Sequence, residues 1–314
     1  MTTKKNSSSK ASKSSGSKPK STGSKTKNQV STNPEVIEEI IDLEPIPAKY
    51  QIPAAQETLQ ESEPEPVVDI LIPYVTQTVK WEELKFALRS IEKFVTTPHR
   101  VIILGSERPE WASEKLLLIE CKQVQGFENA KAFDAVAKLE KAIDSDISTD
   151  FIYTYDDVVF LSDVTLEFLK VRVSHDRLKD ENNIQGFTGS ARWKKVLLNT
   201  LLGLKVNKLP DFNYETHLPR VFNKELMKAT FHKFGFKRSP YMVPTIYFNS
   251  NFEGPEVILD PSSPTIEISK PIPHDLLRVL LGNKKILTYN DNGLTEDLKA
   301  ILMEMFPEKS IYEK

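Results

Sequence analysis

Short apolar runs alternate with helical patterns over residues 67–163, and this alternation is the feature that most constrains the fold. In Val67–Pro73 the apolar residues are nearly continuous, as in a buried strand, whereas in Trp81–Phe94 they recur on one helical face. Further strands are expected at 100–105, 116–120 and 151–155, and a further helix at 129–143. Strands that alternate with helices favour a mostly parallel sheet with helices on both faces. The sequence therefore predicts an α/β fold.

After about Asp163 the pattern loosens into helices and long connections. Helices are expected at Asn223–Phe234 and after Thr295, which suits an N-cap because Glu296 and Asp297 follow it in the first turn. The segment 240–273 is irregular and rich in proline. We therefore expect a helical, loop-rich C-terminal half that wraps the sheet and forms a wall of the site, with residues 67–314 making one domain.

The first 66 residues differ in composition from the rest of the chain. Residues 1–33 contain 8 lysines and no acidic residue, whereas residues 34–66 contain 9 acidic residues and the single lysine Lys49. This leader has too little apolar content to offset the entropy lost on folding, so we expect it to be disordered. Its basic part would bind nucleic acid, acidic lipid or an acidic partner by charge, or act only as a solvated tail. Residues 36–43 have the spacing of a short amphipathic helix that would dock on a protein.

Neither an export signal nor a membrane span is expected. The start of the chain is rich in Ser, Lys, Gly and Thr, where a secretory signal requires an apolar stretch. The best candidate for a span, Val196–Val206, is short and interrupted by polar residues. A cytoplasmic protein is the default expectation. The single cysteine, Cys121, follows an apolar run and has no partner for an internal disulfide, so we interpret it as a core thiol.

Two adjacent carboxylates, Asp156 and Asp157, follow the strand expected at 151–155. Ligands of parallel sheets bind in the crevice outside the carboxyl ends of the strands, which is where this pair is expected to lie. Hard oxygen ligands in that position suit Mg²⁺ or Mn²⁺ next to a diphosphate. The alternative is that the two acids only end a strand and begin a turn.

Three further motifs contain candidate functional residues. His217 precedes Leu218 and Pro219 on an expected extended or turn-like backbone, and its imidazole suits proton exchange or a structural hydrogen bond. Arg238 belongs to a basic pair that either binds phosphate or is solvated. The segment Asn290–Gly293 favours a turn before the last helix. The other histidines lack the spacing of zinc ligands, and none of the glycine-rich phosphate-binding loops is present.

In this order, the motifs resemble those of the Stealth family. That family comprises sugar-1-phosphate transferases of bacterial capsule synthesis, animal relatives that make the lysosomal mannose-phosphate tag, and shorter microbial and phage-encoded proteins. The matching segments are Trp81–Lys93, Val101–Gly105 with Pro109–Trp111, Phe151–Phe160, His217–Pro219, Phe236–Ser239, Ile286–Asn292, and Leu302 with Met305–Glu313. Together they span about 69–314 in the order of the family.

The sequence also departs from the family pattern at three places. The first region is reduced to Asp69–Val75 and lacks the family's glycine. Tyr155 stands where the family has an asparagine before the acidic pair, and Tyr241-Met242 stand where an acid usually follows the arginine. These differences leave the donor and the reaction subtype open.

The resemblance implies a nucleotide-diphospho-sugar site on a fold of the glycosyltransferase-A (Rossmann-like) type. In this interpretation Asp156 and Asp157 hold a divalent cation. His217 acts as general base or acid on the acceptor hydroxyl, and Arg238 stabilises charge on the phosphoryl oxygens. Asp157 is counted among the catalytic groups as well as among the metal ligands. The expected substrate-binding residues are Arg89, Lys131, Asn290, Asp291 and Asn292.

Three functions fit the same residues. The resemblance favours transfer of a sugar-1-phosphate from a nucleotide-diphospho-sugar to a hydroxyl acceptor such as a glycan. The alternative with the same donor is transfer of the sugar itself, by attack at the anomeric carbon. In the third, the fold is inactive and serves as a binding or structural module, and the charged leader is the working part.

Overall fold

The computed structural model describes residues 67–76, 81–126, 128–178 and 190–314. The predicted leader, with the amphipathic helix expected at 36–43, lies outside these residues. Within the described part of the chain, no helix combines the length and the apolar character needed to cross a bilayer.

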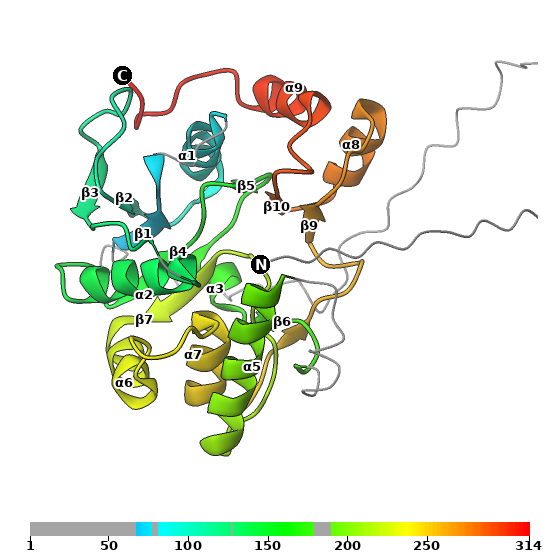
Figure 1. Ribbon diagram of the computed structural model, residues 1–314. Helices are drawn as coiled ribbons and strands as arrows, with labels where there is room; N and C mark the ends of the chain where they lie inside the picture. Colours follow the sequence, from blue (N-terminus) through cyan, green and yellow to red (C-terminus); the bar gives the residue numbers. More distant parts are fainter. Residues whose placement is uncertain (1–66, 77–80, 127, 179–189) are drawn as a thin grey trace, which may run out of the picture. The chain divides into compact units, whose positions relative to one another are not determined.

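A five-stranded sheet with the order β3-β2-β1-β4-β7 forms the centre of the fold (Figure 1). Its strands are β1 (Val68–Pro73), β2 (His99–Gly105), β3 (Leu116–Glu120), β4 (Asp150–Tyr153) and β7 (Arg220–Asn223). The first four run parallel, and only β7 is antiparallel to its neighbour β4. The predicted α/β class with a mostly parallel sheet is therefore confirmed.

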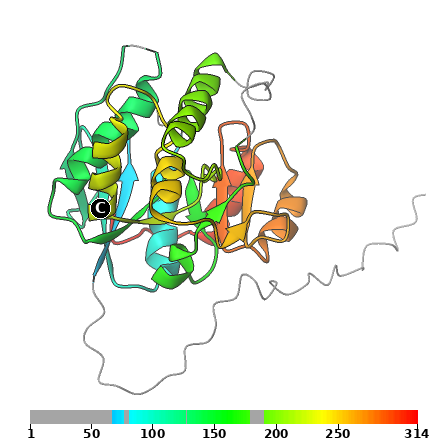
Figure 2. The same cartoon turned by 90° about the horizontal axis from the view of Figure 1, so that it is seen from below.

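Helices cover both faces of this sheet. The helix α1 (Glu83–Phe94) lies on one face, and a group of helices shares a core with the other face, as Figures 1 and 2 show. These are α2 (Ala130–Ile143), α5 (Ala191–Val206), α6 (Lys224–Phe234) and α7 (Val243–Asn251). In β1, Ile70 and Ile72 pack in the α1 core, whereas Leu71 packs in the core of the four helices. Burial on both faces explains why the strand reads as a continuous apolar run.

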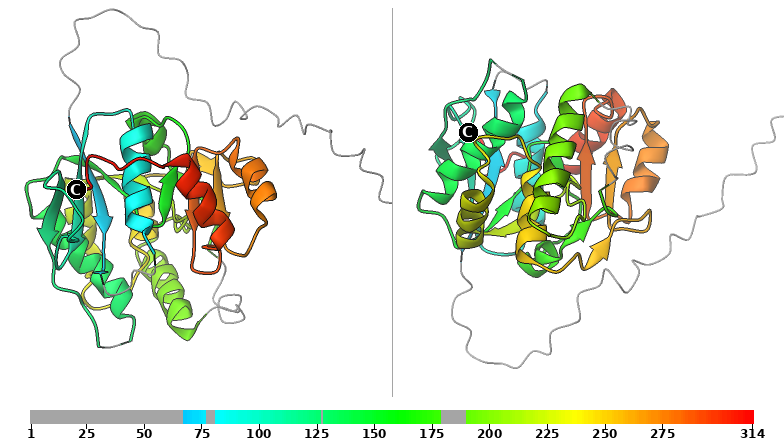
Figure 3. Two further views of the ribbon diagram at one scale, coloured as in Figure 1. Left: turned by 90° about the horizontal axis from the view of Figure 1, so that it is seen from above. Right: turned by 60° about the horizontal axis from the view of Figure 1, so that its bottom comes forward.

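The C-terminal half contains helices, as predicted, and also strands that the sequence analysis did not predict, two of which pair with β5 or with each other in a second sheet. The three-stranded sheet consists of β5 (Val158–Phe160), β10 (Ile286–Tyr289) and β9 (Thr265–Ile268). The helices α8 (His274–Leu281) and α9 (Glu296–Met305) share its apolar core and lie beside it in Figure 3. The described residues also form α3 (Leu166–Lys170) and the paired strands β6 (Val173–Ser174) and β8 (Val257–Ile258).

Three local predictions are confirmed by side-chain positions. The hydroxyl of Thr295 accepts a hydrogen bond from the backbone N–H of Leu298 at 3.3 Å, so Thr295 is the N-cap of α9. The predicted helix after Asn223 is α6, and the Asn223 side chain caps it. Cys121 is buried, and burial raises the pKa of its thiol, as expected for a core cysteine.

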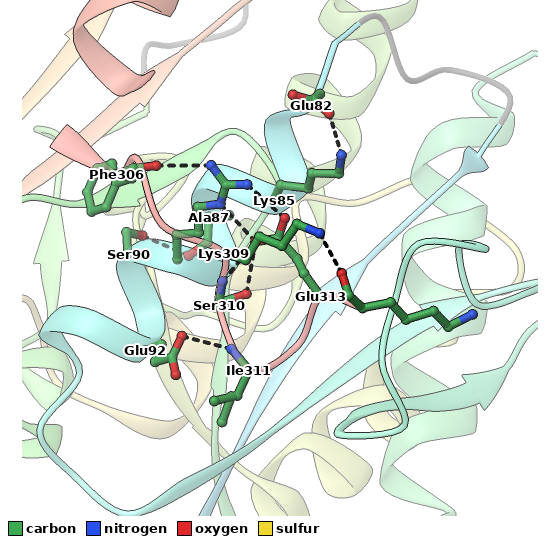
Figure 4. A network of polar contacts seen from close by, with 12 residues as sticks. Glu82, Lys85, Ala87, Ser90, Glu92, Phe306, Lys309, Ser310, Ile311 and Glu313 are labelled. Atoms are coloured by element: carbon green, nitrogen blue, oxygen red, sulfur yellow. Dashed lines mark hydrogen bonds and ion pairs between the residues drawn. The ribbon is translucent and has the colours of Figure 1, made fainter. Parts of the chain in front are cut away.

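The closing segment, Phe306–Lys314, follows α9, returns along α1 and ends beside Trp111–Ser113, which precede β3. Figure 4 shows Phe306, Ser310 and Glu313 of this closing segment next to Ala87 and Ser90 of α1. The backbone N–H of Ile311 donates to Glu92 of α1 at 3.0 Å, and the N–H of Ser113 donates to the carbonyl of Tyr312 at 2.8 Å. The closing segment is therefore bound to the sheet domain by hydrogen bonds at several points.

Candidate functional site

The acidic pair lies where the central sheet meets the three-stranded sheet. Asp156 and Asp157 form the turn between β4 and β5, at the carboxyl end of β4, as the sequence predicts. The carbonyl of Asp157 accepts a hydrogen bond from the N–H of Tyr289 in β10 at 3.4 Å. Because β10 pairs with β5, the end of β10 is held next to the acidic pair.

Negative charge is concentrated around Asp156. Burial, together with the charges of Asp157 and of Glu83 in the first turn of α1, raises the pKa of Asp156 to about 7. Two tyrosines face the same charges: Tyr74, whose pKa is raised to about 12, and Tyr289, whose pKa is also raised, in both cases mainly by burial. The buried Tyr289 hydroxyl has no hydrogen-bond partner among the described residues. A ligand that brings positive charge and an acceptor oxygen would relieve both conditions.

The two carboxylates fit a divalent cation that takes its other ligands from substrate or water. Within the described residues, no group of three or more His, Cys, Asp or Glu side chains is placed to hold a metal ion. Mg²⁺ is commonly bound by one or two protein carboxylates together with phosphate oxygens, and this donor set matches that type rather than a closed structural site.

His217 contacts the acidic pair directly. Its Nε2 lies 2.9 Å from Oδ1 of Asp157, and its ring stacks on Tyr155 with a centroid distance of 4.5 Å and an interplanar angle of 7°. Burial lowers the pKa of His217, but the hydrogen bond and the charge of Asp157 outweigh burial, so the net pKa is raised. The backbone of His217 has a φ of 52°, in the left-handed region that few non-glycine residues adopt.

The segment around His217 is held by a buried arginine. Arg220, at the start of β7, donates from Nε to the carbonyl of Leu218 at 3.1 Å and from Nη1 to the carbonyl of Tyr214 at 3.0 Å. These carbonyls flank His217 on both sides, and Arg220 is only 5% exposed. Hydrogen bonds to a charged donor are stronger than neutral ones, so Arg220 stabilises the unusual backbone conformation of His217.

His217 also lines a cavity of about 610 Å³. Its walls include two cations, Lys131 and Arg192, and five aromatic residues, namely Tyr153, Tyr155, Trp193, Phe222 and Tyr241. The helices α2, α5 and α7 all begin at this cavity. Helix N-termini carry partial positive charge, so together with the two cations they favour an anionic group in this space. The carboxylate of Glu215 is the only acidic side chain among its lining residues in the described part of the chain.

The predicted site residues are only partly brought together. Asp156, Asp157 and His217 meet, and Lys131 lines the cavity that His217 also lines. Arg238 is exposed in the turn after α6 and is absent from the lining of that cavity. Its neighbour Lys237 pairs with Glu140 on α2, and neither Lys237 nor Glu140 lines the cavity. The geometry thus places Lys131, and not Arg238, at the cavity that His217 lines.

Arg89 is engaged by the closing segment instead of facing the cavity. Its Nε and Nη2 donate to the two carboxylate oxygens of Glu313, each at 2.8 Å, and its Nη1 donates to the carbonyl of Phe306 at 2.9 Å. A bidentate pair of this kind fixes both side chains. The geometry gives Arg89 a structural task, namely to hold the end of the chain on α1.

Asn290, Asp291 and Asn292 form an exposed turn at the end of β10. The side-chain oxygen of Asn290 accepts hydrogen bonds from the N–H groups of Asn292 at 3.0 Å and Gly293 at 3.1 Å, so the turn interpretation is confirmed. A Cβ on Gly293 would lie 1.8 Å from the carbonyl oxygen of Ile268, which explains the glycine. The turn directly follows Tyr289, the residue bonded to Asp157, so a role in binding substrate stays a prediction.

Sequence reasoning missed Arg192 and Arg220. Arg220 follows the His217–Pro219 motif directly, and this adjacency was an available signal. Arg192 follows Ser190, whose hydroxyl caps α5 by accepting from the N–H of Trp193 at 3.2 Å. Recognition of that cap would have placed Arg192 in the first turn of a helix, but no sequence pattern connects that turn with His217.

Comparison with known proteins gives only distant similarity. No family model and no curated protein match the sequence. The apo structure of the bifunctional glycosyltransferase WbbM matches with a TM-score of 0.47 and 12% identity, over 81% of this chain and 51% of that one. The glycosyltransferase GlyE of Streptococcus pneumoniae TIGR4 matches with a TM-score of 0.39 and 13% identity, over 78% of this chain and 62% of that one. Its apo form gives a TM-score of 0.37 and 13% identity, over 78% and 61%.

This chain therefore spans about half to three fifths of the structures that it matches. Similarity of this degree transfers no activity from one protein to another. Membership of the Stealth family stays a prediction.

Proposed function

We propose that the chain is a nucleotide-sugar-dependent transferase. The observation that carries this proposal is the contact between His217, which lines a 610 Å³ cavity, and Asp157, the neighbour of Asp156. Adjacent carboxylates at the carboxyl end of a parallel strand suit a metal–diphosphate site. A histidine oriented by one of them suits proton transfer at a hydroxyl.

In the proposed reaction His217 accepts the proton of the acceptor hydroxyl. Nε2 of His217 contacts Asp157, while Nδ1 has no hydrogen bond to any described residue and is the nitrogen proposed to take the proton. The carboxylate of Asp157 then stabilises the imidazolium that forms, because the two groups have opposite charge. Tyr155 keeps the ring in one orientation by stacking on it.

The negative charge of the donor is proposed to lie between the acidic pair and the cations of the cavity. Asp156 and Asp157 would hold Mg²⁺ or Mn²⁺, an ion that supplies charge neutralisation at the diphosphate of a bound donor. Lys131 and Arg192, at the first turns of α2 and α5, would bind phosphoryl oxygens from the cavity side. Arg192 thereby takes the charge-stabilising role that the sequence assigned to Arg238.

The resemblance of the motifs to the Stealth family favours sugar-1-phosphate as the group transferred. In that reaction the acceptor oxygen forms a bond to the β-phosphorus of the donor while the bond from this phosphorus to the bridging oxygen breaks. A nucleoside monophosphate leaves, and the hydroxyl proton goes to His217. If the acceptor attacked the anomeric carbon instead, a nucleoside diphosphate would leave and the sugar alone would be transferred.

The leaving nucleotide distinguishes these reactions. The full chain would be incubated with a panel of nucleotide-diphospho-sugars, Mn²⁺ or Mg²⁺ and glycan acceptors, and the released nucleotide identified by chromatography. A monophosphate supports sugar-1-phosphate transfer, and a diphosphate supports glycosyl transfer. The control is Asp156→Ala combined with Asp157→Ala, which should release neither. If the unaltered chain releases neither nucleotide with any donor, the transferase proposal is wrong and a binding module is the better interpretation.

A further inference from the structure

A second cavity, of about 320 Å³, lies behind the segment that contains His217. It is bordered by parts of all three sheets, including β7, the pair β6 and β8, and the start of β9. Most of its lining is apolar, for example Phe168, Val173, Val257 and Ile286. This volume is at the lower end of the range for small-molecule pockets, so it suits a small ligand with an apolar body.

The second cavity is separate from the candidate transferase site. Within the segment 214–219, Glu215 and His217 line the larger cavity, whereas Thr216 and Leu218 line the second one. Neighbouring residues of this segment thus face different cavities, and the segment forms a wall between the two. A ligand of the second cavity therefore needs no contact with the acidic pair.

Two buried hydrogen-bond donors of the second cavity have no acceptor. Arg220 and Tyr214 both line it, and their side chains are 5% and 1% exposed. Neither Nη2 of Arg220 nor the hydroxyl of Tyr214 has a hydrogen-bond partner among the described residues. Burial raises the pKa of Tyr214 to about 12, so its hydroxyl stays protonated and is a donor at neutral pH.

The charge of Arg220 is also unbalanced. In the part of the chain that the structure describes, its hydrogen bonds go to two backbone carbonyls and none goes to a carboxylate. Buried cations are normally paired with an anion, and a buried donor without an acceptor is unfavourable. The two glutamates that line the cavity are already paired, Glu256 with Arg172 and Glu167 with Lys170.

We propose that this cavity is a binding site for a small carboxylic acid with an apolar body. The apolar walls take the body of the ligand, and its carboxylate accepts hydrogen bonds from Arg220 and Tyr214. This proposal is independent of the transferase reaction, because the ligand is recognised by donors that do not line the larger cavity.

The test uses three probes that share one apolar chain and differ in the head group: octanoate, octan-1-ol and octylamine. Binding to the full chain would be measured by isothermal titration calorimetry and located by chemical-shift changes in NMR spectra. We expect octanoate to bind at least tenfold more tightly than octan-1-ol, octylamine not to bind, and the shifts to map to residues such as Val173 and Ile286. Equal binding of octanoate and octan-1-ol, shifts that map elsewhere, or no saturable binding of octanoate would overturn the proposal.

Variants distinguish the donors. Arg220→Met should weaken the binding of octanoate about tenfold or more and leave the binding of octan-1-ol nearly unchanged. Because Arg220 also supports the backbone around His217, a second variant is needed. Tyr214→Phe removes only a hydroxyl and should weaken the binding of octanoate about threefold. Arg177→Met is the matched control, because Arg177 is an exposed arginine paired with Asp211 outside this cavity. If Tyr214→Phe and Arg220→Met, both folded, bind octanoate as the unaltered chain does, these donors do not recognise the ligand and the proposal is wrong.

Discussion

Two contacts between oppositely charged side chains join distant parts of this molecule, and they differ in how completely their atoms are used. In the closing segment, Arg89 and Glu313 are 14% and 3% exposed, and both carboxylate oxygens are bonded to the guanidinium. At the candidate site, His217 and Asp157 are 40% and 29% exposed, and a single hydrogen bond joins them. The first contact leaves nothing for a ligand, whereas the second leaves an imidazole nitrogen and a carboxylate oxygen available.

This difference separates a structural pair from a candidate catalytic pair. Both Arg89 and His217 were predicted as site residues, because both belong to motifs of the same resemblance. Only the spatial environment distinguishes them, since burial with bidentate pairing favours stability and partial exposure at a cavity favours chemistry. The predictions below alter each contact and ask whether stability or turnover changes.

The largest expected effect is on turnover at the candidate site. Asp157→Asn keeps the shape of the side chain but removes the charge that holds a cation and stabilises the imidazolium. We expect a loss of about 10²–10³ in kcat, or roughly 3–4 kcal/mol, measured by release of nucleotide from the donor identified in the panel. His217→Asn should have a similar effect, and asparagine tolerates the positive φ.

The matched control for these variants is Asp163→Asn, an exposed acid soon after β5. It should leave turnover within about twofold, because surface substitutions away from a site have little effect. The assignment of Asp157 would be contradicted if Asp157→Asn, correctly folded, retained more than about a tenth of the turnover.

The next effect is on stability and should leave the chemistry intact. Glu313→Gln removes the anion that pairs with Arg89 and leaves the guanidinium buried without a counter-charge. Breaking a buried pair in this way costs about 3 kcal/mol in the free energy of unfolding, measured by urea denaturation. Turnover per folded molecule should stay within about twofold, because the pair does not line the candidate cavity.

Asp211→Asn provides the comparison for an exposed pair, since Asp211 bonds Arg177 at the surface. Loss of this surface ion pair should lower the free energy of unfolding by less than about 1 kcal/mol. A fall in turnover for Glu313→Gln that is as large as for Asp157→Asn would mean that Arg89 acts in the reaction after all.

A smaller effect decides between two arginines for the same role. The sequence favours Arg238 for binding phosphoryl oxygens, whereas the geometry favours Arg192 at the cavity. Arg192→Gln should lower kcat/KM about tenfold, which is roughly 1.4 kcal/mol, and Arg238→Gln should change it by less than about twofold. Both are exposed arginines, so each variant is the control for the other. If Arg238→Gln lowered kcat/KM more than Arg192→Gln, Arg238 would be the phosphoryl-binding residue, as the sequence predicted.

The central sheet was predictable because local pattern and burial agree there. Strands buried on both faces, such as Val68–Pro73, read as apolar runs, and amphipathic helices such as Glu83–Phe94 show one apolar face. The acidic pair was placed correctly for the same reason, since the end of a strand is visible in sequence. The short strands Val257–Ile258 and Arg220–Asn223 were missed because so few residues establish no period.

The candidate site was less predictable because its parts come from separate segments. The contact between His217 and Asp157 spans 60 residues, and the one between Arg89 and Glu313 spans 224. A motif identifies residue types that suit a reaction, but partners at such separations depend on tertiary packing. This is why Lys131 and Arg238, alike in charge, ended in different environments.

The smallest effect concerns the pH dependence of the closing segment. Burial alone would raise the pKa of Glu313, but the hydrogen bonds from Arg89 and from the backbone of Ser310, with the charge of Arg89, outweigh it and lower the pKa. The pair therefore stabilises the fold fully at pH values above the ordinary value near 4.5, and this stabilisation is lost as the pH falls through the lowered pKa. The unaltered chain should have a larger free energy of unfolding than Glu313→Gln at pH 7, and this difference should shrink as the solution is acidified toward pH 3. The reason is that the glutamate is protonated over this range, whereas the glutamine does not titrate. Urea denaturation of both chains over this range measures the difference in unfolding free energy. A difference that stays constant down to pH 3 would show that the charge of Glu313 contributes nothing, and that shape and hydrogen bonding alone hold the closing segment.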